Sequence, residues 1–291
     1  MSAVLLALAS AVCFGAMTVA LRVGLRGHPE PDVAAVATTV VAALVALFAA
    51  VFDPGTGELA RPKELAVFAL AGLLAPGLSQ IFLVLAIRDV GAGRTSVVVG
   101  SAPLFAATLA IFLLDEPFEW PLALGAILIV GAGVLLAAES TRPAHFRLVG
   151  VGFALAATIL FSTRDLVVRW YSADTALGSV EAAAAAFVAG TLVIVAYAAV
   201  LRRGELGTAL ASLSLLRFVP AGVFFGLSYV LLFEAYYRGK VTVVSPLVAT
   251  ESLWGVLLAA LILGSSELVG PRLVLGAALV VAGGALIGAS R

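Results

Sequence analysis

The sequence has few of the residues that form disulfide bonds and metal sites. It contains one cysteine, Cys13, which excludes an internal disulfide and any site with several cysteine ligands. Its two histidines, His28 and His145, both fall in predicted loops, so a metal site built on histidine is not expected. Charged residues make up only 12% of the chain, and the net charge of zero gives no indication of a nucleic-acid partner.

Several catalytic patterns are also missing. The sequence contains no phosphate-binding loop after a predicted strand, no Ser-His-Asp arrangement and no cluster of metal ligands. We therefore expect no cofactor and no metal, and we expect that the protein is not an enzyme.

Apolar residues are abundant instead, at 63% of the chain, which is far above their share in soluble proteins. A membrane-spanning helix needs about 20 apolar residues, because each residue adds 1.5 Å and the hydrocarbon core is about 30 Å thick. The pattern predicts an all-α integral membrane protein whose helices use most of the chain. Ten helices are predicted, at 2–23, 32–52, 64–87, 94–114, 120–138, 148–171, 180–201, 218–237, 241–263 and 269–288.

The first of these stretches lacks a basic n-region and has a counterpart in the middle of the chain, so we expect a retained helix rather than a signal peptide. Pro76 and Pro103 lie inside the third and fourth predicted helices. Each removes a backbone hydrogen bond and should kink its helix.

The first half of the chain resembles the second. Residues 7–22 align with residues 154–169 at an offset of 147, and residues 77–79 align with residues 226–228 at an offset of 149. The repeat predicts two five-helix halves, 1–140 and 147–291. Each half has an odd number of helices, so the second must enter the membrane from the opposite side. Inverted repeats of this kind are typical of transporters that expose one central site alternately to each side.

The loop charges give a first indication of orientation. On the N-terminal side the loops carry six Lys and Arg residues, and on the other side they carry ten. Positive-inside counting therefore places both termini outside.

Two corresponding segments resemble a known family. Residues 102–116, APLFAATLAIFLLDE, and residues 249–267, ATESLWGVLLAALILGSSE, are similar to the EamA group of the drug/metabolite transporter superfamily. Pro103, Glu116, Glu251 and Glu267 match the family pattern, whereas Asp115 and Ser252 stand where the family often has Gly and Pro.

The resemblance implies ten helices in two inverted halves and a central cavity lined mainly by helices one, three, four, six, eight and nine. It also implies export of amino acids or other small metabolites, with both termini in the cytoplasm. This orientation opposes the charge count. We favour it because inverted-repeat proteins often have a weak charge bias.

Glu251 is the deepest predicted charge, near the centre of the ninth helix, with Trp254 three residues further on. A carboxylate at that depth costs about 2.5–3.5 kcal/mol on insertion scales. Because desolvation disfavours the charged form, Glu251 could take up and release a proton during transport. The alternative is a permanently protonated or hydrogen-bonded glutamate that ties helices together.

The sixth helix carries Thr158, Ser162, Asp165 and Arg169 on one face. The matching face of the first helix is small and polar, with Ala11, Gly15, Thr18 and Arg22. These faces could line a central cavity. Arg164 and Asp165 could together bind a zwitterion, or Arg164 could pair with Glu251. Snorkelling to the interface or a structural ion pair are the alternatives.

Ser79 and Gln80 match Ser228 and Tyr229 in the repeat, and polar groups at that depth need a partner, either another helix or a substrate. Three residues near the end of the eighth helix are predicted to form an interfacial belt, and two glycine runs to pack helices closely. The belt residues are Glu234, Tyr236 and Tyr237, and the glycine runs are 131–133 and 283–284.

The sequence thus predicts a secondary transporter of amino-acid-like or related amphipathic solutes, with export favoured, by alternating access at a cavity between the halves. The alternative is proton-coupled multidrug efflux of lipophilic cations, with Glu251 as the exchanged carboxylate. An intramembrane enzyme or scaffold is disfavoured, because the polar residues largely follow the repeat. The candidate substrate-binding residues are Thr18, Ser79, Gln80, Thr158, Ser162, Arg164, Asp165, Tyr229 and Trp254, and the candidate proton carrier is Glu251.

The expected partners are a small-molecule substrate, the lipid bilayer and protons as the coupling ion, and no nucleic acid. We expect a monomer, with a dimer as the alternative. The expected location is the plasma membrane of a prokaryote, which is the inner membrane if the cell is Gram-negative.

Overall fold

The computed structural model describes residues 2–27, 30–53, 62–105, 108, 120–137, 146–172, 175–210, 213–239 and 241–289. These residues are almost entirely helical, and no strand occurs among them. The α-helices are α1 (Ala3–Gly27), α2 (Pro31–Val51), α3 (Pro62–Gly72), α4 (Ser79–Val90), α5 (Ala92–Val99), α7 (Trp120–Ala137), α8 (Val149–Ser172), α9 (Ser179–Arg202), α10 (Leu206–Leu210), α11 (Val219–Arg238), α12 (Val241–Val248), α13 (Glu251–Leu258) and α14 (Pro271–Ala289).

Seven helical segments in the described part of the chain are long and apolar enough to cross a membrane. They are 3–27, 31–51, 62–90, 149–172, 179–202, 215–238 and 244–263. Two shorter apolar helices, Trp120–Leu136 and Pro271–Ile287, lie where the fifth and tenth helices were predicted. The end of the fourth predicted helix, 94–114, falls outside the described residues from 109 onward, as do Asp115 and Glu116. The count of ten therefore stays a prediction.

Proline marks the start of many of these helices. Pro31, Pro62, Pro121, Pro220 and Pro271 each occupy the first or second position of a helix. Proline is favoured there because its missing N–H would have no partner inside the helix, and its fixed φ already suits the helical backbone. The chain therefore enters each of these helices at a residue that cannot lie in the middle of one without disrupting it.

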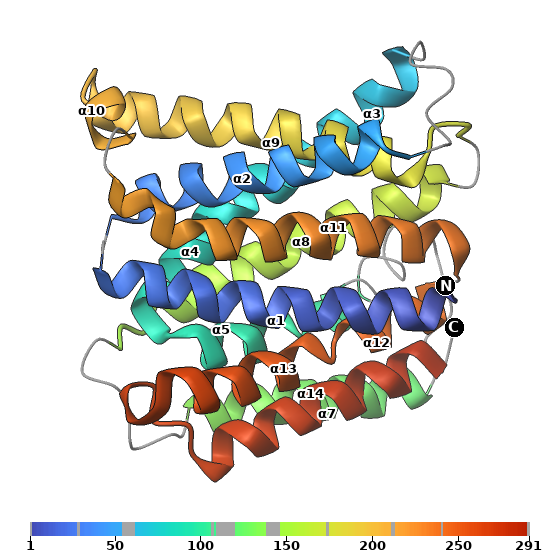
Figure 1. Cartoon of the computed structure of the whole chain (residues 1–291). Helices are drawn as coiled ribbons and strands as arrows, with labels where there is room; N and C mark the ends of the chain where they lie inside the picture. Colours follow the sequence, from blue (N-terminus) through green and yellow to red (C-terminus); the bar gives the residue numbers. More distant parts are fainter. Residues whose placement is uncertain are drawn as a thin grey trace.

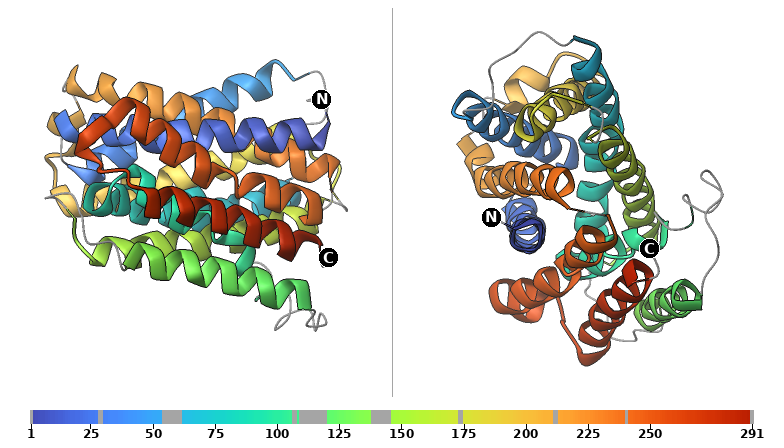
Figure 2. Two further views of the ribbon diagram at one scale, coloured as in Figure 1. Left: turned by 90° about the horizontal axis from the view of Figure 1, so that it is seen from below. Right: turned by 90° about the vertical axis from the view of Figure 1, so that its right-hand side faces the viewer.

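The helices form one bundle in which spatial neighbours often come from different halves of the chain (Figure 1). α1 packs against α11 and α13, α8 against α4 and α5, α2 against α9, and α7 against α14. The α2–α9 and α7–α14 pairs lie at opposite edges of the bundle, both in Figure 1 and in the end-on view of Figure 2. Both termini lie at the same end of the bundle, and α8 runs in the opposite direction to α1 (Figure 1).

Three of the spans are interrupted. The α3–α4 span contains a π-helical segment, η1 (Leu73–Leu78), where Ala75 has an extended backbone before Pro76, as the predicted kink requires. α5 ends at Val99, and a turn precedes Pro103. α12 ends at Val248, and α13 begins at Glu251 after a two-residue turn. Glu251 therefore lies near the middle of the helical segment 244–263, as expected, but directly after this turn and at the start of α13.

Glycine allows some of these helices to approach very closely. A Cβ on Gly72 of α3 would lie 2.2 Å from the carbonyl oxygen of Ala186 on α9, and a Cβ on Gly125 of α7 would lie 2.5 Å from that of Gly283 on α14. Gly131 and Gly133 differ, since no atom of the described residues lies within 4 Å of a Cβ added at either position. The prediction of close helix packing is thus confirmed for Gly283 and wrong for the run at 131–133.

The outer surface is apolar, as a membrane requires. Phe48, Ile127 and Leu192 expose 65–67% of their surface. Such side chains belong in lipid, because an isolated soluble bundle rarely presents apolar patches of this extent to water.

Candidate functional site

A group of buried polar side chains lies where α8, α11 and α13 face one another. It consists of Arg164 and Asp165 on α8, Tyr229 and Tyr236 on α11, and Glu251 at the start of α13, and we refer to these five residues as the polar cluster. All except the half-buried Asp165 expose 5% or less of their surface. The two carboxylates, the guanidinium and the two phenols are close enough to interact electrostatically.

Arg164 pairs with its neighbour in the chain. Its Nε lies 2.7 Å from an Oδ1 oxygen of Asp165. Its Nη1 nevertheless has no hydrogen-bond acceptor among the described residues. Adjacent residues on a helix diverge, so this pair satisfies charge but leaves donors unused. A buried guanidinium with unused donors is suited to bind a carboxylate, which can accept two parallel hydrogen bonds.

Aromatic rings surround the same guanidinium. The Cζ atom of Arg164 lies 4.3 Å from the ring centroid of Tyr229 and 5.7 Å from those of Phe161 and Phe233. The negative faces of aromatic rings attract cations, most strongly where water is excluded. Phe225 continues the aromatic wall, with its centroid 4.9 Å from that of Tyr229. The site therefore offers cation-binding ring faces as well as charged groups.

Glu251 is the second carboxylate of the polar cluster. It interacts with Asp165 and Arg164, and no salt-bridge partner lies within 4.0 Å among the described residues. With one guanidinium and two carboxylates, the ionised cluster has an excess of one negative charge. In a low-dielectric interior an excess charge is costly, so this site favours the uptake of one cation or one proton.

Tyr236 does not lie in the interfacial belt that the sequence predicts. It exposes only 2% of its surface and interacts with the Asp165 carboxylate. The spacing from Tyr229 could have predicted this burial, because residues seven apart lie on the same face of a helix. The belt interpretation is therefore wrong for Tyr236.

The other hydroxyl candidates mainly connect helices. Thr158 and Ser162 on α8 both donate to carbonyl groups of their own helix, at 2.7 and 2.9 Å. Ser162 also donates to the carbonyl of Ala102, at 3.1 Å. Thr18 on α1 donates to the carbonyl of Gly15 at 2.8 Å and lies 3.2 Å from the Ser96 hydroxyl of α5. These contacts favour helix association over substrate binding.

Ser79, Gln80 and Trp254 lie apart from these contacts. Ser79 and Gln80 are fully buried on α4, and their side-chain polar atoms have no hydrogen-bond partner among the described residues. Trp254 is half-buried, and its Cβ lies 2.9 Å from where a Cβ on Gly15 would be. The structure thus places Arg164, Asp165, Tyr229 and Glu251 together. It shows no contact between that group and Ser79, Gln80 or Trp254 among the described residues.

None of the five polar-cluster residues lines the surface hollow that lies elsewhere on the described part of the bundle. That hollow, of about 490 Å³, lies at the ends of α2 and α9 and is lined by Asp32, Leu201, Arg202, Arg203 and Glu205. Within the described ranges, no group of three or more His, Cys, Asp and Glu side chains could hold a metal ion. The polar cluster is therefore a group of mostly buried polar side chains that lies apart from this hollow.

Comparisons with known proteins agree with this fold. A crystal structure described only as "Crystal structure of protein" is similar over 98% of this chain and 95% of its own, with a TM-score of 0.63 and 19% sequence identity. At that identity the likeness shows the fold alone. A comparison with curated proteins gives no match.

The family comparison is more specific. The sequence model of the EamA-like transporter family matches residues 1–138 and again residues 148–289. The matches cover almost the whole chain, and the chain also carries helices able to cross a membrane. The protein therefore belongs to the EamA-like transporter family and is a multi-pass membrane transporter.

Proposed function

We propose that the protein is a secondary transporter that exports small amphipathic solutes bearing an ammonium group, such as amino acids and related metabolites. The transported solute binds at the polar cluster and is exposed alternately to each side of the membrane. The observation that carries this proposal is the buried group of Arg164, Asp165 and Glu251, located at a break in a membrane-spanning helix. Intramembrane charges at such breaks are typical of substrate sites in secondary transporters.

The proposed architecture is ten spans in two inverted halves, 1–140 and 147–291. It is supported by contacts that recur when the halves are exchanged. α1 packs against α11, and the corresponding pair α8 and α4 also packs together. Arg22 donates to the carbonyl of Arg88 at 3.2 Å, and its counterpart Arg169 donates to the carbonyl of Tyr236 at 3.1 Å. Two halves of the same packing can exchange conformations, which is the basis of alternating access.

The solute class follows from the chemistry of the polar cluster. A zwitterion would place its carboxylate on the unused donors of Arg164 and its ammonium against Glu251 and the Tyr229 ring. An apolar side group would lie against the aromatic wall. Glu251 would carry a proton when no ammonium is bound, which couples the solute to a proton gradient.

One observation favours a second candidate, the proton-coupled efflux of lipophilic cations. The excess carboxylate and the aromatic faces around Arg164 both attract cations that carry no carboxylate. Such a cation and a proton would compete for the same negative charge.

The proposed location is the plasma membrane of a prokaryote, the inner membrane in a Gram-negative cell, with both termini in the cytoplasm. The proposed partners are the solute, lipid and protons. We propose a monomer as the transporting unit, with a dimer as the alternative.

Reconstitution in liposomes tests the proposal. Purified protein is assayed with a panel of radiolabelled amino acids and with tetraphenylphosphonium, with and without a pH gradient. We expect saturable, gradient-dependent movement of at least one amino acid. Saturable movement of tetraphenylphosphonium alone would instead support the second candidate, and movement of neither would contradict both.

A matched control distinguishes the polar cluster from its surroundings. Thr163 is next to Arg164, and its hydroxyl donates to the carbonyl of Ile159 at 2.8 Å on the exposed side of α8. Thr163→Val should transport like the wild type, whereas Arg164→Met should lose transport of the amino acid. Equal loss in both variants would show that the effect comes from α8 packing.

A further inference from the structure

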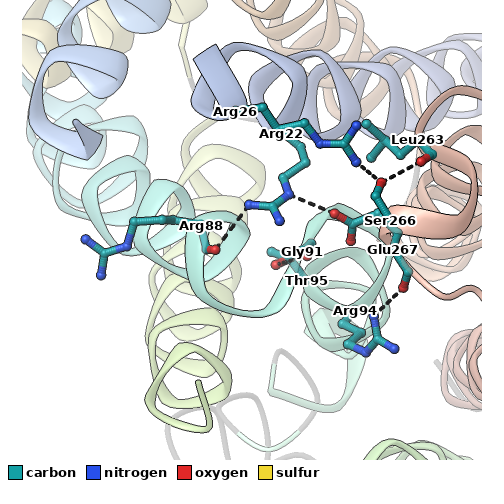
Figure 3. A network of polar contacts seen from close by, with 9 residues as sticks. All are labelled: Arg22, Arg26, Arg88, Gly91, Arg94, Thr95, Leu263, Ser266 and Glu267. Atoms are coloured by element: carbon teal, nitrogen blue, oxygen red, sulfur yellow. Dashed lines mark hydrogen bonds and ion pairs between the residues drawn. The ribbon is translucent and has the colours of Figure 1, made fainter. Parts of the chain in front are cut away.

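A second buried charged network lies at the end of the bundle opposite the termini. Figure 3 shows it, formed by the end of α1, the turn between α4 and α5, and the segment that follows α13. Its central residues are Arg22, Arg94 and Glu267, which we call the arginine–glutamate network. They expose 7%, 0% and 0% of their surface. Glu267 matches the family pattern in the sequence, yet it lies outside the proposed solute site.

Arg22 holds Glu267 through its side chain. The Nε of Arg22 donates to an oxygen of the Glu267 carboxylate at 2.7 Å. The same guanidinium donates to the carbonyl of Arg88, at 3.2 Å, and so also holds the end of α4. One arginine therefore connects three elements of the bundle (Figure 3).

Arg94 holds Glu267 from the other side. Its Nη1 donates to the main-chain carbonyl of Glu267, at 2.7 Å. Gly91 makes room for this arrangement, because a Cβ at that position would lie 1.9 Å from the second carboxylate oxygen of Glu267. Gly91 also has a φ of 90°, which side-chain-bearing residues rarely adopt. At the rim of the network, Arg26 donates to the hydroxyl of Ser266.

The hydrogen bonds made to Ser266 and Glu267 join the first half of the chain to the second. Arg22, Arg26 and Arg94 belong to residues 1–140, whereas Ser266 and Glu267 belong to residues 147–291. At the opposite end of the bundle, Glu64 accepts hydrogen bonds from the main-chain N–H groups of Ala176 and Leu177, at 3.0 and 3.1 Å. That tie also joins the halves, but its hydrogen bonds are exposed or half-buried.

The network is connected to the solute site through a short rod of helix. Glu251 begins α13, and the helical structure continues through a π-helical segment, η3 (Ala259–Leu263), to the turn before Glu267. At 1.5 Å per residue, the 13 residues from Glu251 to Leu263 span about 20 Å. A tilt of this rod would move Glu251 and Glu267 together.

From these contacts we propose that Arg22, Arg94 and Glu267 form the gate that closes one end of the transport path, and that transport requires the Arg22–Glu267 pair to separate. The inference rests on the proposed alternating access. In the closed state the pair satisfies two charges that are buried together. Opening admits water, which then solvates each charge separately, so the gate can switch without leaving a charge buried alone.

Distance measurements between spin labels test the gate without any transported solute. Cysteines replace Val23 on α1 and Val274 on α14, two exposed side chains from different halves, in a Cys13→Ala background. The labelled protein is reconstituted in liposomes. Wild-type gate residues should give a main short distance. Glu267→Gln, which keeps the size of the side chain but removes its charge, should increase the population at longer distance by at least about tenfold.

Arg147→Gln is the matched control. It removes an arginine from the same end of the bundle. This side chain is 66% exposed, and its Nη1 lies as far as 4.0 Å from the Asp89 carboxylate, so it forms at most a weak ion pair. It should leave the distances unchanged. Arg22→Gln combined with Glu267→Gln should open the gate little more than either change alone, because the two residues act as one pair.

Two results would contradict the proposal that these residues form a gate. One is an unchanged distance distribution in folded Glu267→Gln protein, with folding checked by monodisperse elution. The other is an equal shift in Arg147→Gln. Neither depends on which solute is carried, so a wrong solute class would leave this test intact and would appear only in the liposome transport assay.

Discussion

The guanidinium of Arg164 lies over the ring of Tyr229, with its Cζ atom 4.3 Å from the ring centroid. The contact joins α8 to α11 and places a permanent positive charge inside the membrane. Aromatic faces and one adjacent carboxylate, that of Asp165, stabilise this charge. The energetics of the polar cluster therefore depend on Arg164 and its neighbours as a unit.

Removing Arg164 alone should destabilise the protein strongly. Arg164→Ala strands the Asp165 carboxylate in the interior, and breaking a buried pair costs about 3–5 kcal/mol. The double variant Arg164→Met/Asp165→Leu should recover most of that loss, because apolar residues of similar size need no partner. Thermal unfolding in detergent measures both effects. A single variant as stable as the double would show that Asp165 is solvated without Arg164.

Tyr229 should act mainly through its ring. Its hydroxyl has no hydrogen-bond partner among the described residues, so Tyr229→Phe should keep both stability and solute affinity. Tyr229→Leu removes the cation-binding face, and a desolvated contact of this kind contributes about 2 kcal/mol. Solute binding, measured by calorimetry once a solute is known, should weaken by roughly 30-fold in the leucine variant. Equal weakening in both variants would assign the role to the hydroxyl instead.

Glu251→Gln should abolish gradient-driven transport but preserve exchange of solute across the liposome membrane. Glutamine keeps the size and hydrogen-bonding capacity of the side chain, yet it cannot release a proton near neutral pH. In the wild type, transport should respond to pH on both sides of the membrane, and in the variant that response should disappear. A variant with the wild-type pH profile would remove Glu251 from the coupling mechanism.

Two glycines should respond in opposite ways to the same substitution. Gly72→Ala would place a methyl group 2.2 Å from the Ala186 carbonyl oxygen, so α3 and α9 must separate, at a cost of about 1–3 kcal/mol. Gly133→Ala meets no atom of the described residues within 4 Å and improves helix propensity, so it should be neutral or stabilising by up to about 1 kcal/mol. Thermal unfolding of the two variants, side by side, checks the difference.

A reporter fused to the C-terminus should be active only in the cytoplasm. The sequence count of ten basic residues against six opposes this topology. Two of the ten, Arg22 and Arg94, are buried in the arginine–glutamate network rather than free at the surface. Discounting them leaves eight against six, which is a small bias. Activity of an export-dependent reporter at the same position would reverse the orientation.

The sequence contained enough information for the class of fold and for part of the site. Long apolar runs predicted most of the helices to within a few residues, because hydropathy and length alone decide whether a segment can span a bilayer. Pro76 correctly predicted a kink. Arg164, Asp165, Tyr229 and Glu251 were identified individually as intramembrane polar groups, which are rare enough to stand out.

What could not be predicted depends on how helices pack. Nothing local distinguishes Gly133, which has no close neighbour among the described residues, from Gly125, which contacts Gly283. The break before Glu251 has no proline at that point, and the family's frequent proline is replaced by Ser252. The partnership of Arg22 with Glu267 spans 245 positions, and no spacing rule connects residues so far apart.

The contacts between the halves also bear on how the chain is made. Synthesis delivers Arg22 and Arg94 to the membrane long before Glu267 emerges from the ribosome. Until then these two arginines, which are buried in the final structure, lack the Glu267 partner. The face of α1 that will contact α11 and α13 is covered in the meantime by lipid or by other helices. Residues 1–140 must therefore remain without this partner during insertion, and the final segments of the chain complete these contacts.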